Sequence, residues 1–218
     1  MREDLEIFRD HCVFMWSVYR HSKVLFEHNS DDDRARMERT ASIFFGDICR
    51  ILHEYVILQV CKITDPPRSL GKKDNHTVDF LLERYGTGDD PEAKRQLDVR
   101  RDRLMAFRAK VLPARNKFIS HSDRDAIMAG QSLGGMPDAE WEYFWSDLER
   151  LVGILHEKVL GSPLRFLEVG MASDADGLLK ALRHAECFDR LLNIGDPALT
   201  QLCADLALGE DRYPRTGN

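Results

Sequence analysis

The sequence predicts an all-α protein, a bundle of long antiparallel helices with extra helices at the C-terminal end. Apolar residues recur every three or four positions over several long stretches, which is the helical period. No stretch shows convincing strand alternation, and residues 164–169 are the only short candidate. Proline, glycine and capping residues separate the helical stretches, as expected for a bundle with short connections.

Composition places the chain among ordinary globular proteins. It has 218 residues, of which 43% are hydrophobic and 31% are charged, enough for one sizeable core. No apolar run approaches the roughly 20 residues that span a bilayer, so we expect no membrane segment. The charged start of the chain lacks the apolar core of a signal peptide. Five dispersed cysteines argue against a disulfide framework, and we expect a cytoplasmic location.

Two long helices are expected in the first part of the chain. Apolar residues at helical spacing predict the first over residues 3–28. Asp31–Asp33 is expected to supply the N-cap and favourable first-turn charges of the second, over residues 34–63. Residues 43–61 are apolar on most sides, which predicts a central, buried helix.

The middle of the chain alternates between breakers and helices. Pro66 and Pro67 end the second helix, because proline cannot continue it. Thr77 is expected to cap a short helix over residues 78–85. Pro91 fits the first turn of a helix over residues 91–120.

Pro113 lies inside that fourth helix and leaves two alternatives. Either the helix kinks there, or a new helix begins with Pro113 in its first turn. A glycine-rich loop over residues 129–137 follows, and then Asp138 is expected to cap a helix over residues 138–160. Gly161 is expected at the C-terminal end of that helix.

Shorter helices are predicted from about 173 to 192 and from 197 to 208. The expected organisation is therefore a helical bundle over residues 1–162, a helical extension packed on it over 163–208, and a disordered tail over 209–218.

Charge is unevenly distributed. The net charge is −6, which by itself disfavours a polyanionic partner. Between residues 94 and 117, however, nine basic residues face two acidic ones. The basic residues are Lys94, Arg95, Arg100, Arg101, Arg103, Arg108, Lys110, Arg115 and Lys117. This segment predicts either a surface that holds a nucleic-acid backbone or an ordinary solvated helix face.

The most distinctive polar stretch runs from Pro113 to Asp123. Arg115 suits anion binding, and His121 is of the residue type that exchanges protons near neutral pH. On one straight helix these two side chains would point about 120° apart. Cooperation between them therefore requires a helix break near Ser120 or a two-fold dimer in which one copy's arginine approaches the other's histidine.

This stretch resembles the Arg-x(4–6)-His signature of the HEPN superfamily, whose form often has a polar residue after the arginine, here Asn116. The closest resemblance is to the abortive-infection U-type HEPN-like group. Thr64-Asp65-Pro66 and Asn75-His76-Thr77-Val78 also resemble that group, and the likeness covers about residues 35–160. It implies a HEPN-like helical bundle, often dimeric, and in many members a metal-independent ribonuclease.

The resemblance also implies roles for residues. His121 would be the general acid or base, Arg115 would stabilise charge on the phosphate, and Asn116 would orient His121 or the phosphate. The expected RNA contacts are Lys117, Lys110, Arg108, Ser122 and Asp123. No metal or cofactor is expected. The implied biology is a toxin or phage-defence protein, a homodimer, with an antitoxin as a further partner.

Two other classes remain open. The same bundle could be an inactive module that binds RNA, a nucleotide or a protein, or a structural subunit whose basic helix pairs with an acidic partner. Cys49 and His53 have the spacing of metal ligands on a helix but sit in the most apolar stretch, which favours core packing. Trp141 and Trp145 are expected in the core.

Overall fold

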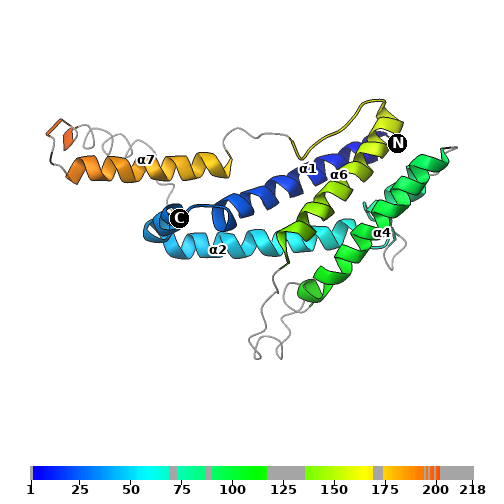
Figure 1. Cartoon of the computed structure of the whole chain (residues 1–218), viewed down its shortest axis with the longest axis horizontal. Helices are drawn as coiled ribbons and strands as arrows, with labels where there is room; N and C mark the ends of the chain where they lie inside the picture. The colour runs from blue at the N-terminus through cyan, green and yellow to red at the C-terminus, as the bar shows by residue number, and fades with distance from the viewer. Residues whose placement is uncertain are drawn as a thin grey trace, which may run out of the picture. The chain divides into compact units, whose positions relative to one another are not determined.

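The computed structural model describes residues 2–68, 73–86, 90–116, 136–168 and 174–193, together with residues 195, 197, 198, 200 and 201. Its elements are α1 (Arg2–Ser22), a π-helix η1 (Lys23–Glu27), α2 (Asp31–Ile63), α3 (Val78–Tyr85), α4 (Pro91–Ala114), α6 (Asp138–Leu160) and α7 (Ala175–Asn193) (Figure 1). Within these described ranges there is no strand, only an isolated bridge between Arg68 and Asp74. The predicted all-α class is confirmed. None of the described helices is long and apolar enough to cross a membrane.

The chain forms two compact units, of which the first comprises Met1–Lys23 and Gly46–Met171. In this unit α4 packs along α6, α1 packs on α6, and α3 packs on α4 (Figure 1). Aromatic rings fill the centre: Trp145 is 1% exposed and its ring lies 5.3 Å from that of Trp16 and 5.2 Å from that of Tyr19. Trp141 and Trp145 therefore belong to the core, as predicted.

The second unit comprises Val24–Phe45 and Ala172–Asn218. A small apolar cluster in it includes Leu25, Met37 and Leu179. Beside the cluster, the buried carboxylate of Asp33 accepts hydrogen bonds from Arg36 Nη1 at 2.5 Å and Arg183 Nε at 2.8 Å. This charge network joins the N-terminal part of α2 to α7. The predicted domain boundaries at residues 162 and 208 stay predictions.

Asp33→Asn is expected to lower the free energy of unfolding by about 2 kcal/mol at pH 7. The hydrogen bond from Arg183, helped by Ser30 and the charge of Arg36, lowers the pKa of Asp33 to about 2, although burial acts in the opposite direction. Because the folded-state pKa lies below the unfolded one, this stabilisation is present above about pH 4 and is lost as the pH falls towards 2.

Urea unfolding followed by circular dichroism between pH 2 and pH 7 measures this effect. Asp31→Asn is the matched control, because the Asp31 side chain is 99% exposed and pairs only with Arg34 at 3.3 Å in the contacts described. Equal stability of the two variants at pH 7 would contradict the prediction.

The helix ends agree only in part with the sequence. Thr77 caps α3 by accepting a hydrogen bond from Phe80 N, Pro91 lies in the first turn of α4, and Gly161 ends α6 with a φ of 74°. The α1 prediction was too long, because apolar spacing does not distinguish an α-helix from the π-helix that follows Ser22.

Two predicted caps were wrong. The N-cap of α2 is Ser30, whose Oγ accepts from Asp33 N at 3.1 Å, so the helix begins at Asp31 and the three aspartates occupy its first turn. At α6 the N-cap residue is Pro137, without a side-chain bond. Asp138 instead forms an ion pair with Lys23 at 2.5 Å.

The prediction that residues 43–61 form a buried helix was also wrong. Val56, Val60 and Cys61 are buried, but Ile43 is 81%, Phe44 58% and Ile51 56% exposed. Apolar composition on all sides shows what a helix could bury, whereas the number of neighbouring helices decides what it does bury.

Candidate functional site

The site begins where α4 ends. The α-helix stops at Ala114, and Arg115 is its C-cap, with its backbone N–H donating to the carbonyls of Val111 and Leu112. Arg115 and Asn116 continue as a π-helical turn. Of the helix predicted to residue 120, α4 covers the part up to Ala114 with Pro113 inside it, and residues 117–120 lie outside the described residues.

Arg115 is half-buried and is held by its neighbour. Its Nη1 donates to Asn116 Oδ1 at 3.0 Å. Asn116 was expected to orient the histidine or the phosphate, and in the structure its amide oxygen orients the arginine. A neutral partner leaves the full positive charge of the guanidinium group available to an anion.

Arg108 lies beside the end of α2, where Asp65 follows the helix. Arg108 Nη2 donates to Asp65 Oδ1 at 2.6 Å, and both side chains are about three-quarters buried. Thr64 fixes this end of the helix, because its buried Oγ1 donates to the carbonyl of Val60 at 2.6 Å. Asp65 was not among the predicted site residues; the Thr64-Asp65-Pro66 segment was the signal that pointed to it.

The pKa of the Cys61 thiol is affected by charged side chains near the ends of both α2 and α4. Burial raises the pKa of its thiol, and Arg108 and Arg115 both act to lower it, while Asp65 acts to raise it. We call the group formed by Cys61, Asp65, Arg108, Arg115 and Asn116 the arginine cluster. It brings together residues from α2 and α4 that are about fifty positions apart in the sequence.

Both arginines of this cluster have spare hydrogen-bonding capacity. The Nε atoms of Arg108 and Arg115 are buried and have no hydrogen-bond partner within the described part of the chain. Buried donors are normally paired, and a guanidinium group can bind phosphate oxygens through two parallel N–H bonds. The cluster is therefore chemically suited to an oxyanion.

The loop between α2 and α3 is closed by the second motif segment. Asn75 Nδ2 donates to the carbonyl of Pro66 at 2.9 Å, and Asn75 N donates to that of Pro67 at 2.8 Å. His76 Nε2 lies 3.6 Å from Asp4 Oδ1, on α1. Asn75 thus holds the backbone that directly follows Asp65. None of these contacts joins His76 to the arginine cluster.

Four of the predicted site residues, Lys117, His121, Ser122 and Asp123, lie outside the described residues, as do residues 129–135 of the glycine-rich loop. Their predicted roles stay predictions. The predicted helix break near Ser120 also lies outside the described residues and stays a prediction.

The basic segment is largely neutralised by neighbours. Ion pairs join Arg95 to Glu92, Arg101 to Asp79, Arg103 to Asp147, Arg108 to Asp65 and Lys110 to Glu140. Lys110, predicted to contact RNA, bonds Glu140 at 2.7 Å. Most of the basic side chains of α4 named here are therefore paired with carboxylates and do not form an open cationic face. Arg115 differs, because its bond in the described structure is to a neutral group.

The described residues contain no group of three or more His, Cys, Asp or Glu side chains able to hold a metal ion. Cys49 and His53, the pair with ligand spacing, contact each other at 3.6 Å, and His53 Nδ1 bonds the carbonyl of Cys49 at 2.7 Å.

Comparison with protein families decides the relationship. Residues 3–177, which make up most of the chain, match the AbiU2 family of HEPN proteins. The chain belongs to the AbiU2 family. No curated protein and no solved structure matches it.

Membership of the AbiU2 family confirms the resemblance found in the sequence and extends it at both ends, from residues 35–160 to residues 3–177. The match includes α1, which supplies much of the aromatic core, and the arginine cluster at the ends of α2 and α4. The AbiU2 match ends at residue 177, so most of α7 lies beyond it.

Proposed function

We propose that this chain is a metal-independent endoribonuclease of the HEPN type with a toxin or phage-defence role. The observation that carries the proposal is the arginine cluster, in which Arg108 and Arg115 keep buried donors without a partner in the described residues. A phosphate of the RNA backbone pairs with the charge of Arg115, whose bond in the described structure is to the neutral Asn116. Arg115 lies six residues before His121, so the anion site and the expected acid or base belong to one segment.

The proposed reaction uses the hydroxyl that distinguishes RNA from DNA. The 2′-oxygen attacks the adjacent phosphorus, the bond from phosphorus to the 5′-oxygen breaks, and a 2′,3′-cyclic phosphate and a free 5′-hydroxyl remain. His121 accepts the proton of the 2′-hydroxyl or donates one to the leaving 5′-oxygen. Arg115 stabilises the charge that grows on the non-bridging phosphate oxygens, and Asn116 holds its guanidinium group.

A homodimer belongs to this proposal, since a second copy could complete the site. Exposed apolar side chains on the first unit support it: Ile7 is 52%, Phe14 56% and Ile51 56% exposed, and the Phe14 ring lies 6.0 Å from that of Tyr55 on α2. An antitoxin partner is a further expectation of the toxin role.

The test is cleavage of a labelled single-stranded RNA by the full chain in the presence of a chelator. The expected result is cleavage that persists in excess EDTA and yields 2′,3′-cyclic phosphate ends. An RNA with one 2′-deoxynucleotide at the cleaved position should resist cleavage there and nowhere else. Cleavage at the 2′-deoxy position at an unchanged rate would contradict the proposed mechanism.

The second candidate is a module that binds RNA or a protein without turnover. The pairing of the α4 cations with carboxylates favours it, because such a surface attracts a polyanion only weakly. Salt-dependent RNA binding without cleavage products distinguishes this function from the first.

A further inference from the structure

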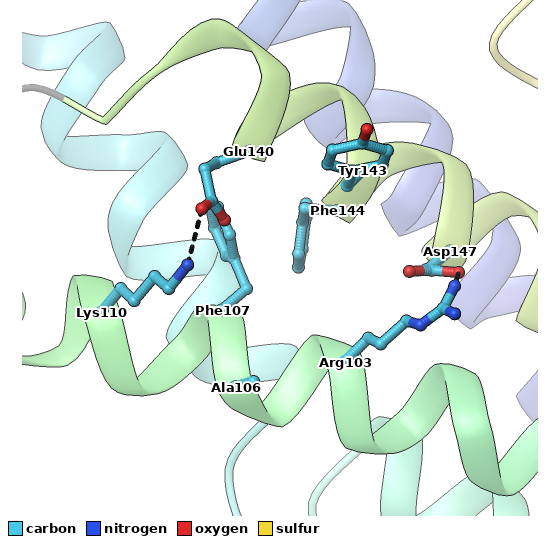
Figure 2. Close-up of a pocket in the computed structure, with 8 residues that line it drawn as sticks. All are labelled: Arg103, Ala106, Phe107, Lys110, Glu140, Tyr143, Phe144 and Asp147. Carbon is cyan, nitrogen blue, oxygen red and sulfur yellow. Dashed lines mark hydrogen bonds and ion pairs between the residues drawn. The ribbon is translucent and has the colours of Figure 1, made fainter.

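A pocket of about 370 Å³ lies between α4 and α6 in the first unit. Its lining residues are Arg103, Ala106, Phe107, Lys110, Glu140, Tyr143, Phe144 and Asp147 (Figure 2). The volume falls in the range of sites that take small organic groups. Arg108 and Arg115 project from a different side of α4, at about 100° per residue, so the pocket is separate from the arginine cluster.

Two ion pairs stand at opposite ends of the pocket. Lys110 Nζ bonds Glu140 Oε1 at 2.7 Å, and Arg103 Nη1 lies 3.5 Å from Asp147 Oδ1 (Figure 2). Arg103 and Lys110 are two helical turns apart, a span of about 10 Å along α4. Each end therefore offers both an N–H donor and a carboxylate acceptor, and the four charges cancel.

The space between the ion pairs is aromatic. Phe107 and Phe144 form its floor, with ring centroids 4.7 Å apart and exposed fractions of 4% and 2%. Tyr143 stands at the rim and is 71% exposed, which leaves one large ring available for stacking (Figure 2).

We propose that this pocket binds one unstacked base of a single-stranded RNA. The base edge carries both donors and acceptors, which match the paired carboxylate and cation at each end. Its ring packs against Tyr143 and the phenylalanine floor, as bases of single strands do on aromatic side chains. Because the charges cancel, the pocket offers no excess positive charge for a phosphate. This inference rests on the proposed function and gives it a base-binding subsite outside the catalytic centre.

The experiment measures binding of a short single-stranded RNA whose 2′-oxygens are all methylated, so that no cleavage can occur, by fluorescence anisotropy. Tyr143→Ala should weaken binding about tenfold or more, whereas Tyr143→Phe, which keeps the ring, should bind like the wild type. Phe44→Ala removes another exposed ring, on α2, and should leave RNA binding unchanged. Replacing single bases with abasic sites should weaken wild-type binding at one position and have no effect at that position on Tyr143→Ala.

The outcomes separate this inference from the proposed function. If binding depends on Tyr143 but the chain cleaves no RNA, base binding in the pocket is supported and the proposed ribonuclease activity is contradicted. If the wild type and Tyr143→Ala cleave RNA with the same KM, or bind it equally, base binding in the pocket is contradicted. The proposed ribonuclease activity is not affected by that result. The absence of all oligonucleotide binding overturns it as well. A change confined to the oligomeric state of Tyr143→Ala in sedimentation overturns it and assigns this face to a protein contact.

Discussion

His121→Ala is expected to lower the rate of single-stranded RNA cleavage by about 10²- to 10⁴-fold, the usual contribution of a general acid or base. The fold should be retained, because the aromatic core and the α4–α6 packing are built from other residues. His184→Ala is the matched control, since His184 is exposed on α7 and lies outside the proposed site. The measurement is single-turnover cleavage at saturating enzyme, with circular dichroism for the fold.

Arg115→Ala should cause a loss of similar size, about 10²- to 10³-fold, if Arg115 stabilises the phosphate charge. Arg115→Lys should recover only part of it, because an ammonium group keeps the charge but lacks the planar pair of donors. Arg165→Ala removes the same charge from a side chain that is 73% exposed and pairs with Glu168, and should leave cleavage unchanged.

These variants test two different roles in one proposed site, proton transfer by His121 and charge stabilisation by Arg115. Full activity of both His121→Ala and Arg115→Ala would show that the HEPN signature is not the catalytic centre of this chain. Loss of activity in Arg115→Ala alone would keep the anion site and transfer the proton chemistry to another residue.

Trp145→Ala is expected to lower the free energy of unfolding by about 4 kcal/mol, the largest stability effect anticipated here. The Trp145 ring is 1% exposed and contacts the rings of Trp16, Tyr19 and Phe144, so its loss opens a cavity between α1 and α6. The indole Nε1 is buried with no partner in the described residues. Trp145→Phe keeps most of the packing and removes this unpaired donor, so it should cost only about 1 kcal/mol.

Chemical unfolding followed by tryptophan fluorescence and circular dichroism measures both variants. Tyr143→Ala is the control from the same helix, because a ring that is 71% exposed contributes little to the core. If Trp145→Ala were no less stable than Tyr143→Ala, the aromatic cluster would not be the centre of this unit.

Local sequence determined most of the helices. The limits of α3 and the end of α6 at Gly161 were predictable because capping and helix-breaking residues act within one turn. The HEPN relationship was also predictable, since the Arg115–His121 spacing and the Thr64-Asp65-Pro66 segment are local patterns, and the AbiU2 match confirms it.

Capping was mispredicted where two polar residues competed. Ser30 and Asp31–Asp33 could each start α2, and the choice depended on Arg183, which lies 150 positions from Asp33 and engages its carboxylate. Asp138 likewise bonds Lys23 of the π-helix rather than its own helix end. Side chains that have a distant partner are not free to cap.

Only the tertiary structure decided which charges of α4 are free and which helix faces are covered. The sequence determined that residues 94–117 are basic, but carboxylates just after α2, on α3 and on α6 pair with Arg108, Arg101 and Lys110. It determined that α2 is apolar, but not that Ile51 is left exposed. Charge and hydrophobicity are properties of residues, whereas neutralisation and burial depend on which segments the fold brings within a few ångströms.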